Sequence, residues 1–176
     1  MKLFLGGARS GKSSKADEVA TEHDDVVYLA TGVVTDEEME ERVKRHKEDR
    51  PDHWITIEEE LDLGREFAKL KDEEFSGAVI LDCLGFWVSN IIRNIDEDKN
   101  LSIEEAVSDK VCSDLRIVQD VDYELLIVSN IVGMGVVPGS PAGRQFRDAL
   151  GRANQVVAEL VDEAYLMVAG MELRLK

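Results

Sequence analysis

The chain has 176 residues, of which 44% are hydrophobic, and this is the size and composition of one ordinary domain with its own core. Its formal net charge of −16 excludes the basic face with which proteins neutralise nucleic-acid phosphates, so we expect no nucleic-acid partner. The sequence has no apolar run of about 18 residues, so it predicts no membrane span. Its first apolar run, Leu3–Leu5, stops at two glycines and is too short for a secretory signal. We therefore expect a cytoplasmic protein.

Short apolar segments alternate with segments of helical periodicity along the chain. Continuous apolar strands are typical of a parallel sheet covered by helices on both faces. Met171–Leu175 alternates apolar and polar residues after Gly170 and predicts an antiparallel strand at the edge of the sheet. The sequence therefore predicts an α/β fold, a single domain over residues 1–176 with a mostly parallel sheet. The expected parallel strands are Lys2–Leu5, Val26–Ala30, Ala78–Leu81, Leu125–Ser129 and Ala164–Val168.

Six helices are expected between and after these strands. Thr35 is a candidate N-cap for the second helix, and Ser102 with Glu105 has the spacing of a capping box. Gly151 lies within the last helix and indicates either a weak position or a close packing contact. The expected helices are Ser13–Thr21, Asp36–Glu48, Leu61–Lys71, Phe86–Asn94, Ser102–Val118 and Gly143–Leu160.

Three segments are expected to be irregular: Gly32–Thr35, Arg50–Thr56 and Asn130–Ala142. The last is long and rich in glycine and proline, which in a compact domain favours a functional loop. Cys83 and Cys112 have no metal-like spacing and are expected to be buried apolar thiols. The tryptophans, Trp54 and Trp87, are expected to anchor the core or an interface rather than stack on a ligand.

The strongest motif follows the first strand. Its eight residues match the phosphate-binding pattern G-x-x-x-x-G-K-[ST] and are followed by an expected helix. In this pattern the backbone N–H groups surround phosphate oxygens, and the helix N-terminus adds a favourable dipole. We therefore predict a nucleoside triphosphate site, in which Lys12 reaches the β- and γ-phosphates and the Ser13 hydroxyl ligates Mg²⁺. The alternative is a glycine-rich turn that binds nothing. The motif comprises Gly6, Gly7, Ala8, Arg9, Ser10, Gly11, Lys12 and Ser13.

A nucleotide site of this kind also needs an acidic residue for the metal. The segment Val79–Asp82 is a buried-strand pattern that ends in a carboxylate. We predict that Asp82 acts with Ser13 in binding Mg²⁺. The alternative is that Asp82 caps the helix expected at Phe86–Asn94.

His46 lies near the end of an expected helix, among several cations. One interpretation is an exposed histidine favoured at that position by the helix dipole. The other is a nucleophile toward phosphorus, since imidazole is partly unprotonated near neutral pH and neighbouring cations could hold triphosphate oxygens. The residues alone leave both interpretations open. The cations are Arg42, Arg45, Lys47 and Arg50.

At this point the sequence resembles a known family, the bifunctional adenosylcobinamide kinase / adenosylcobinamide-phosphate guanylyltransferases of cobalamin biosynthesis. The phosphate-binding motif alone is shared by many unrelated NTPases. The segment around His46 and the loop Val132–Pro138 are far more specific to this family. The resemblance runs nearly end to end. It rests on Gly6–Ser13, Tyr28–Thr31, Glu38, Met39, Arg42, His46, Lys47, Arg50, Pro51, His53, Trp54, Ser129, Asn130, Val132–Pro138, Arg144–Asp148, Gly151, Asn154 and Gln155.

The resemblance implies two reactions in one region. Members of the family phosphorylate the aminopropanol hydroxyl of adenosylcobinamide, a corrinoid, with GTP or ATP. They then accept GMP from GTP onto a histidine, which here is His46, and pass it to adenosylcobinamide phosphate. The resemblance also implies a RecA-like P-loop fold and a homotrimer. The residues implied to complete the guanine nucleotide site are Ala30, Thr31, Gly32, Lys47, Glu48, Asp49, Arg50, Glu58 and Asp82.

Two other functions are compatible with the nucleotide motif. The first is a P-loop kinase of small molecules in which His46 is structural and no covalent step occurs. The second is a RecA-like regulatory switch whose GTP state controls a partner. Covalent labelling of the chain by GTP, discussed below, distinguishes all three.

Overall fold

The computed structural model describes residues 1–33, 37, 41, 44, 50–95 and 101–176. Its sheet has the strand order β3-β2-β4-β5-β1-β6-β7. Every strand is parallel to its neighbours except β7, which pairs antiparallel with β6, so the predicted α/β fold with its antiparallel edge strand is confirmed. The strands are β1 (Lys2–Gly6), β2 (Val26–Ala30), β3 (Ile55–Glu58), β4 (Ala78–Asp82), β5 (Glu124–Asn130), β6 (Glu163–Val168) and β7 (Met171–Arg174).

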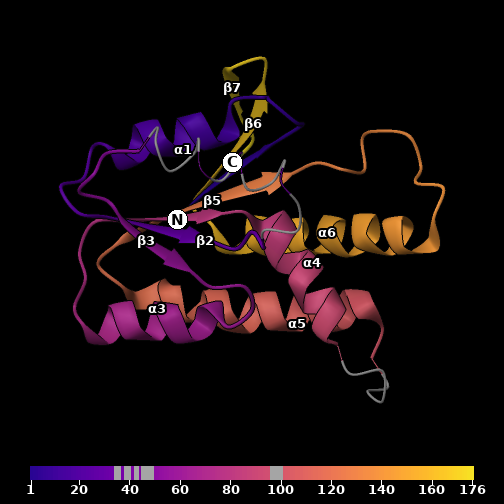
Figure 1. The fold of residues 1–176 in the computed structure, drawn as a ribbon, viewed down its shortest axis with the longest axis horizontal. Helices are drawn as coiled ribbons and strands as arrows, with labels where there is room; N and C mark the ends of the chain where they lie inside the picture. The colour runs from indigo at the N-terminus through magenta and orange to yellow at the C-terminus, as the bar shows by residue number, and fades with distance from the viewer. Residues whose placement is uncertain (34–36, 38–40, 42–43, 45–49, 96–100) are drawn as a thin grey trace.

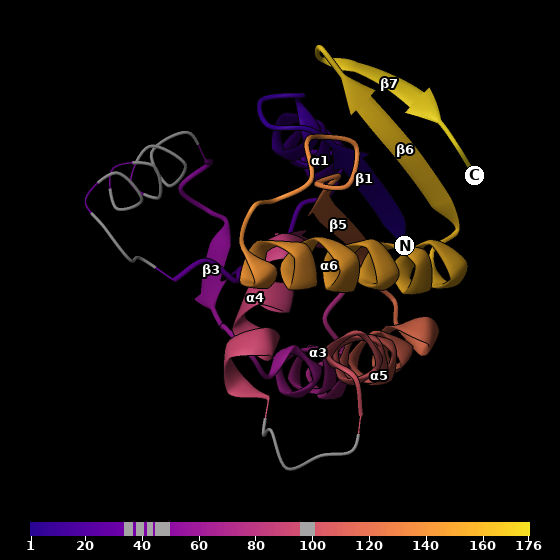
Figure 2. The same ribbon diagram turned by 90° about the vertical axis from the view of Figure 1, so that its right-hand side faces the viewer.

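Helices cover both faces of the sheet, but unequally. α1 lies on one face, and α3, α4, α5 and α6 lie on the other (Figures 1 and 2). The hairpin of β6 and β7 extends past α6 at the end of the sheet (Figure 2). The helices are α1 (Lys12–Ala20), α3 (Leu63–Asp72), α4 (Leu84–Asn94), α5 (Ile103–Arg116), the 3₁₀ turn η1 (Ile117–Asp120) and α6 (Pro141–Leu160).

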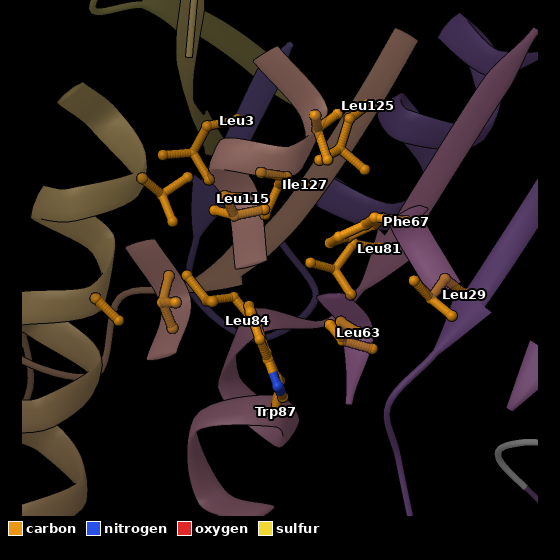
Figure 3. Close-up of a cluster of buried hydrophobic side chains, with 14 of the residues drawn as sticks. Leu3, Leu29, Leu63, Phe67, Leu81, Leu84, Trp87, Leu115, Leu125 and Ile127 are labelled. Atoms are coloured by element: carbon orange, nitrogen blue, oxygen red, sulfur yellow. The ribbon is translucent and has the colours of Figure 1, made fainter. Parts of the chain in front are cut away.

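The larger core lies between the sheet and the four helices α3–α6. Alternate side chains of each central strand point into it, because successive side chains of a strand face opposite sides of the sheet. Figure 3 shows Phe67 and Trp87 among the strand and helix side chains of this cluster. The Trp87 indole N–H donates to the Leu61 carbonyl at 3.1 Å, so this predicted core anchor is confirmed with its polar atom satisfied.

One strand was not expected. β3 includes Ile55 and Thr56, which the sequence assigned to an irregular segment. It is a short edge strand, and Ile55 is 60% exposed, so the continuous apolar pattern of a buried strand is missing. The Arg50–Thr56 prediction is therefore wrong at its end. Trp54, just before β3, is buried as expected.

The helix predictions differ from the structure mainly at the N-termini. α6 begins at Pro141 because the Ser140 side chain accepts from the Gly143 N–H at 3.1 Å and proline is favoured in the first turn. The capping box of Ser102 and Glu105 is confirmed. Of the helix expected at Asp36–Glu48, the described residues Glu37, Glu41 and Lys44 have helical backbone, and Thr35 lies outside the described residues.

Both cysteines are free thiols; Cys83 is buried and Cys112 is half-buried. In the part of the chain that the structure describes, no helix is long and apolar enough to cross a membrane.

Candidate active site

Several of the predicted site residues lie where the parallel strands end. The strand register aligns Ala30 of β2 with Glu58 of β3 and with Asp82 of β4. In the same way, Gly6 of β1 aligns with Asn130 of β5. This carboxyl edge is where open α/β sheets bind ligands.

The phosphate-binding motif forms a tight loop between β1 and α1. Gly11 is the N-cap of α1 with a φ of 97°, and Arg9 also has a positive φ of 54°. Gly6 has no room for a side chain, because a Cβ there would lie 2.5 Å from the Ser10 hydroxyl and 2.6 Å from the Met167 carbonyl. No side chain caps the N-terminus of α1, so its first N–H groups can bind an anion.

The lysine of the motif lies inside this loop. The Lys12 ammonium donates to the Gly7 carbonyl at 2.6 Å, and the side chain is only 8% exposed. The hydroxyl of Ser10 is buried without a hydrogen-bond partner among the described residues. A buried ammonium, a buried hydroxyl and the helix N-terminus together suit phosphate oxygens.

The C-terminal hairpin braces the loop, which sequence reasoning missed. The Gly170 N–H donates to the Ser10 carbonyl at 2.9 Å. A Cβ on Gly11 would lie 3.1 Å from the Gly170 Cα. The sequence marks Gly170 only as the residue before the edge strand, and its φ of 80° fits a tight turn between β6 and β7. Its contact with the phosphate loop joins opposite ends of the chain, and no local pattern indicates it.

Asp82 is fixed by a buried tyrosine. Its carboxylate accepts from the Tyr28 hydroxyl at 2.6 Å, while the guanidinium of Arg50 lies 3.2 Å from the centre of the Tyr28 ring. Burial, and then the charge of Asp82, raise the pKa of the Tyr28 hydroxyl well above its usual range, so it stays a donor. The N-cap of α4 is Cys83, and the alternative that Asp82 caps this helix is therefore wrong.

Thr31 fixes the backbone that follows Asp82. Its hydroxyl donates to the Cys83 carbonyl at 2.8 Å and accepts from the Cys83 N–H at 2.9 Å. The Asn90 amide of α4 donates to the Thr31 carbonyl at 2.8 Å. Asn90 is buried, and sequence reasoning missed it because nothing in a helical pattern marks one polar residue as an anchor.

The pKa of the Cys83 thiol is affected by charges from both the phosphate loop and β4. Burial, and then the charge of Asp82, raise the pKa of its thiol to about 12, against the opposing effects of backbone hydrogen bonds and Lys12. Lys12 of the phosphate loop and Asp82 of β4 therefore both act on one buried atom. β4 and β1 are separated only by β5, which corresponds to roughly 10 Å.

Two of these residues suit a magnesium ion. Mg²⁺ prefers oxygen ligands and commonly uses one or two carboxylates together with substrate phosphates. Asp82 offers a carboxylate at the end of β4, and Ser13 offers a hydroxyl in the first turn of α1. Within the described ranges, no group of three or more His, Cys, Asp or Glu side chains is gathered as a metal cluster. The donor set thus fits an ion that is held partly by a bound nucleotide.

The remaining predicted site residues divide into two groups. Gly32 is half-buried beside Thr31, and Glu58 is exposed at the end of β3. Arg50 lies against Tyr28. His46, Lys47, Glu48 and Asp49 lie outside the described residues. The assignment of these last four residues to the site stays a prediction.

Comparisons with known proteins agree over the whole chain. Residues 2–175 match the sequence model of the family described as "Cobinamide kinase / cobinamide phosphate guanyltransferase". The "Bifunctional adenosylcobalamin biosynthesis protein CobU" of Escherichia coli (strain K12) is 34% identical over 183 residues, which cover 100% of this chain and 99% of that protein. The "Bifunctional adenosylcobalamin biosynthesis protein CobP" of Pseudomonas aeruginosa is 36% identical over 176 residues, covering 99% and 96%.

The fold has its own relatives among solved structures. An ATPase from the type III secretion system of pathogenic bacteria superposes with a TM-score of 0.55 and 8% sequence identity. The match covers 98% of this chain and 56% of the ATPase. At this identity the likeness shows the fold alone, and it agrees with the predicted α/β architecture.

Proposed function

The chain belongs to the cobinamide kinase / cobinamide phosphate guanyltransferase family, and we propose that it catalyses both reactions in one active site. In the first, GTP or ATP phosphorylates the aminopropanol hydroxyl of adenosylcobinamide. In the second, GMP from GTP is joined to the resulting phosphate to give adenosylcobinamide-GDP. The observation that carries the proposal is the intact phosphate loop, which faces the tyrosine-bound carboxylate of Asp82 at the same edge of the sheet.

In the kinase reaction the acceptor hydroxyl oxygen attacks the γ-phosphorus. The bond from that phosphorus to the β–γ bridging oxygen breaks, the nucleoside diphosphate leaves, and the hydroxyl proton is released. The N–H groups at the start of α1 and the ammonium of Lys12 hold the phosphate oxygens. Most of the rate enhancement in such transfers comes from positioning and charge stabilisation, which these groups supply.

In the guanylyl transfer a nitrogen of His46 attacks the α-phosphorus of GTP, and pyrophosphate leaves. A phosphate oxygen of adenosylcobinamide phosphate then attacks the same phosphorus, and the N–P bond breaks. Arg50, four residues after His46 in the sequence, lies against Tyr28, which holds Asp82. This contact supports a role for the His46 segment, with Lys47, Glu48 and Asp49, at the same nucleotide.

Ser13 and Asp82 would hold Mg²⁺, which would supply positive charge to the phosphates of the bound nucleotide. Ala30, Thr31, Gly32 and Glu58 complete the nucleotide site at the ends of β2 and β3. The enzyme works in the cytoplasm as a homotrimer.

The test is covalent labelling. The protein is incubated with Mg²⁺ and GTP labelled at the α-phosphate, denatured, and assayed for label that is stable to alkali and labile to acid. We expect label on the wild type and on a His23→Ala control, because His23 lies beside Glu124 at the opposite edge of the sheet. We expect none on His46→Ala.

Other outcomes would favour the competing functions. Unlabelled wild type that still phosphorylates adenosylcobinamide would indicate a kinase without the covalent step. GTP binding with slow hydrolysis, and no transfer to any acceptor, would indicate a regulatory switch.

A further inference from the structure

A pocket of about 320 Å³ lies next to the phosphate loop. Leu5, the residue before the loop, forms one wall. The segment after β5, with Ile131, Val132 and Met134, forms another, and Leu150 of α6 closes a third side. The pocket is therefore largely apolar and begins where the phosphate-binding backbone begins.

Hydrogen bonds fix this pocket to the active-site edge of the sheet. The Ile131 N–H donates to the Gly6 carbonyl at 3.2 Å, which ties the pocket wall to the first residue of the phosphate loop. The Asn154 side chain of α6 accepts from the Ser129 hydroxyl at 2.6 Å and donates to the Asn130 carbonyl at 3.1 Å. The pocket is thus built on the ends of β1 and β5.

Two polar side chains line the pocket, Arg147 and Asn154. The two bonds of the Asn154 amide use one of its two N–H groups, so among the described residues the other is available to a ligand. Arg147 brings a guanidinium, which pairs with Asp148 at 2.8 Å. Apolar walls with a few polar groups suit a ligand that is part alkyl and part amide, hydroxyl or phosphate.

The volume limits what can enter. About 320 Å³ corresponds to roughly ten water molecules at about 30 Å³ each. A corrin macrocycle is far larger, so only one of its side arms can fit. At the rim of the pocket, Met134 is 80% exposed, and beyond it Val136 and Val137 are 95% and 61% exposed. These side chains offer an apolar surface on which the ring can rest while an arm points inward.

The position of the pocket matches the needs of group transfer. Residues assigned to the nucleotide, including Ala30, Arg50 and Glu58, belong to β2, β3 and the segment before β3. The pocket lies on the other side of β4, at β5 and β1. Donor and acceptor then occupy neighbouring positions along one edge of the sheet, and the pocket begins beside the phosphate loop, so a phosphoryl group can pass between them.

We propose that this pocket is the acceptor subsite, which holds the aminopropanol arm of cobinamide with its reacting oxygen toward the phosphate loop. The arm's alkyl carbons lie against Leu5, Val132 and Leu150, and its amide bonds to Asn154. After phosphorylation, Arg147 faces the new phosphate. This inference rests on the proposed function and specifies where its second substrate binds.

Gly151 provides a direct test. It lines the pocket on α6, and a Cβ built on it meets no atom within 4 Å. The Cβ of Gly151→Leu therefore has room, its longer side chain takes up space beside the pocket, and leucine favours a helix more than glycine does. We expect KM for adenosylcobinamide to rise about tenfold or more in the kinase assay, with KM for GTP unchanged within about twofold. Gly151→Ala is the control, and it should remain close to wild type.

A second pair of variants tests the charge. Arg147→Gln should raise KM for adenosylcobinamide phosphate in the guanylyl transfer more than KM for adenosylcobinamide in the kinase reaction, because only the former carries a phosphate. Arg152→Gln is the matched control, since Arg152 also lies on α6 but bonds to Gln155 and does not line the pocket.

The possible failures are distinguishable. If wild-type protein phosphorylates no cobinamide, the proposed function is wrong. If wild type is active and Gly151→Leu leaves KM for adenosylcobinamide within twofold, the acceptor subsite is wrong while the function stands. If Gly151→Leu raises KM for GTP instead, the pocket serves the nucleotide and the inference is also overturned.

Discussion

The hydroxyl of Tyr28 is the donor that orients Asp82, so Tyr28→Phe removes this one interaction and leaves the ring in place. The bond is 2.6 Å long, its donor is buried and its acceptor is a carboxylate. Hydrogen bonds to charged groups contribute about 1.5–3 kcal/mol, but Asp82 is only half-buried and water can partly replace the lost donor. We therefore expect a loss of about 1–2 kcal/mol in the free energy of unfolding, measured by urea titration.

Tyr123→Phe is the matched control. The Tyr123 hydroxyl is also buried, but it has no hydrogen-bond partner among the described residues. Removing an unsatisfied buried hydroxyl removes a desolvation cost, so this variant should be neutral or slightly more stable. Equal losses in the two variants, or no loss in Tyr28→Phe, would refute the assignment of Tyr28 as the positioning donor.

The same variant has a functional readout that a purely structural role would not produce. A carboxylate that has lost its orienting partner binds a metal less well, typically by about 10- to 100-fold. We expect the Mg²⁺ concentration at half-maximal kinase activity to rise by about tenfold in Tyr28→Phe and to stay at the wild-type value in Tyr123→Phe. An unchanged magnesium dependence would show that Asp82 does not act through the metal.

Three further predictions follow from single contacts. Lys12→Ala should reduce kcat/KM of the kinase reaction by about 100-fold or more, while Lys15→Ala on the same helix should not; equal rates in wild type and Lys12→Ala would contradict the phosphate assignment. Gly11→Ala should lower the unfolding free energy by about 1 kcal/mol or more, because it combines a φ of 97° with a contact of 3.1 Å to Gly170; a thermal melt unchanged from wild type would contradict this. Hydrogen bonds from the Leu61 and Asp62 N–H groups hold the pKa of Glu59 below its usual 4.5. Glu59 therefore stabilises the fold above pH 4.5 and loses this effect as the pH falls, so Glu59→Gln should flatten the decline of Tm between about pH 5 and 3.

The parts of the fold that were predicted share one property, a pattern that is complete within a few residues. β2 spans Val26–Ala30 as expected, because a strand buried on both faces is apolar at every position. Ser102 marks the start of α5 because its partner Glu105 is three residues away. β3 lacks such a signal, since it is short and lies at an edge, where no core on both faces makes every position apolar.

The same distinction between local and distant patterns holds for the active site. The phosphate loop is contiguous in the sequence, so its residues and their roles could be predicted from the motif. The contacts that hold Asp82 could not, because Thr31 and Cys83 lie 52 positions apart, and Tyr28 lies 54 positions from Asp82. Such pairs are set by the strand register, which depends on the packing of the whole sheet.

Gly151 shows how a structure can decide between two interpretations of a residue. In the sequence, a glycine inside a long helix indicated a weak position or a close packing contact. In the structure, a Cβ added to Gly151 would meet no atom within 4 Å, and the residue is one of those that line the pocket beside the phosphate loop. A larger residue would help the helix and fill the pocket, so the glycine costs about 1 kcal/mol of helix propensity and keeps the pocket open. A protein that needed only a stable α6 would gain nothing from a glycine at this position. A protein that must admit a substrate arm beside its nucleotide gains the space that the glycine leaves.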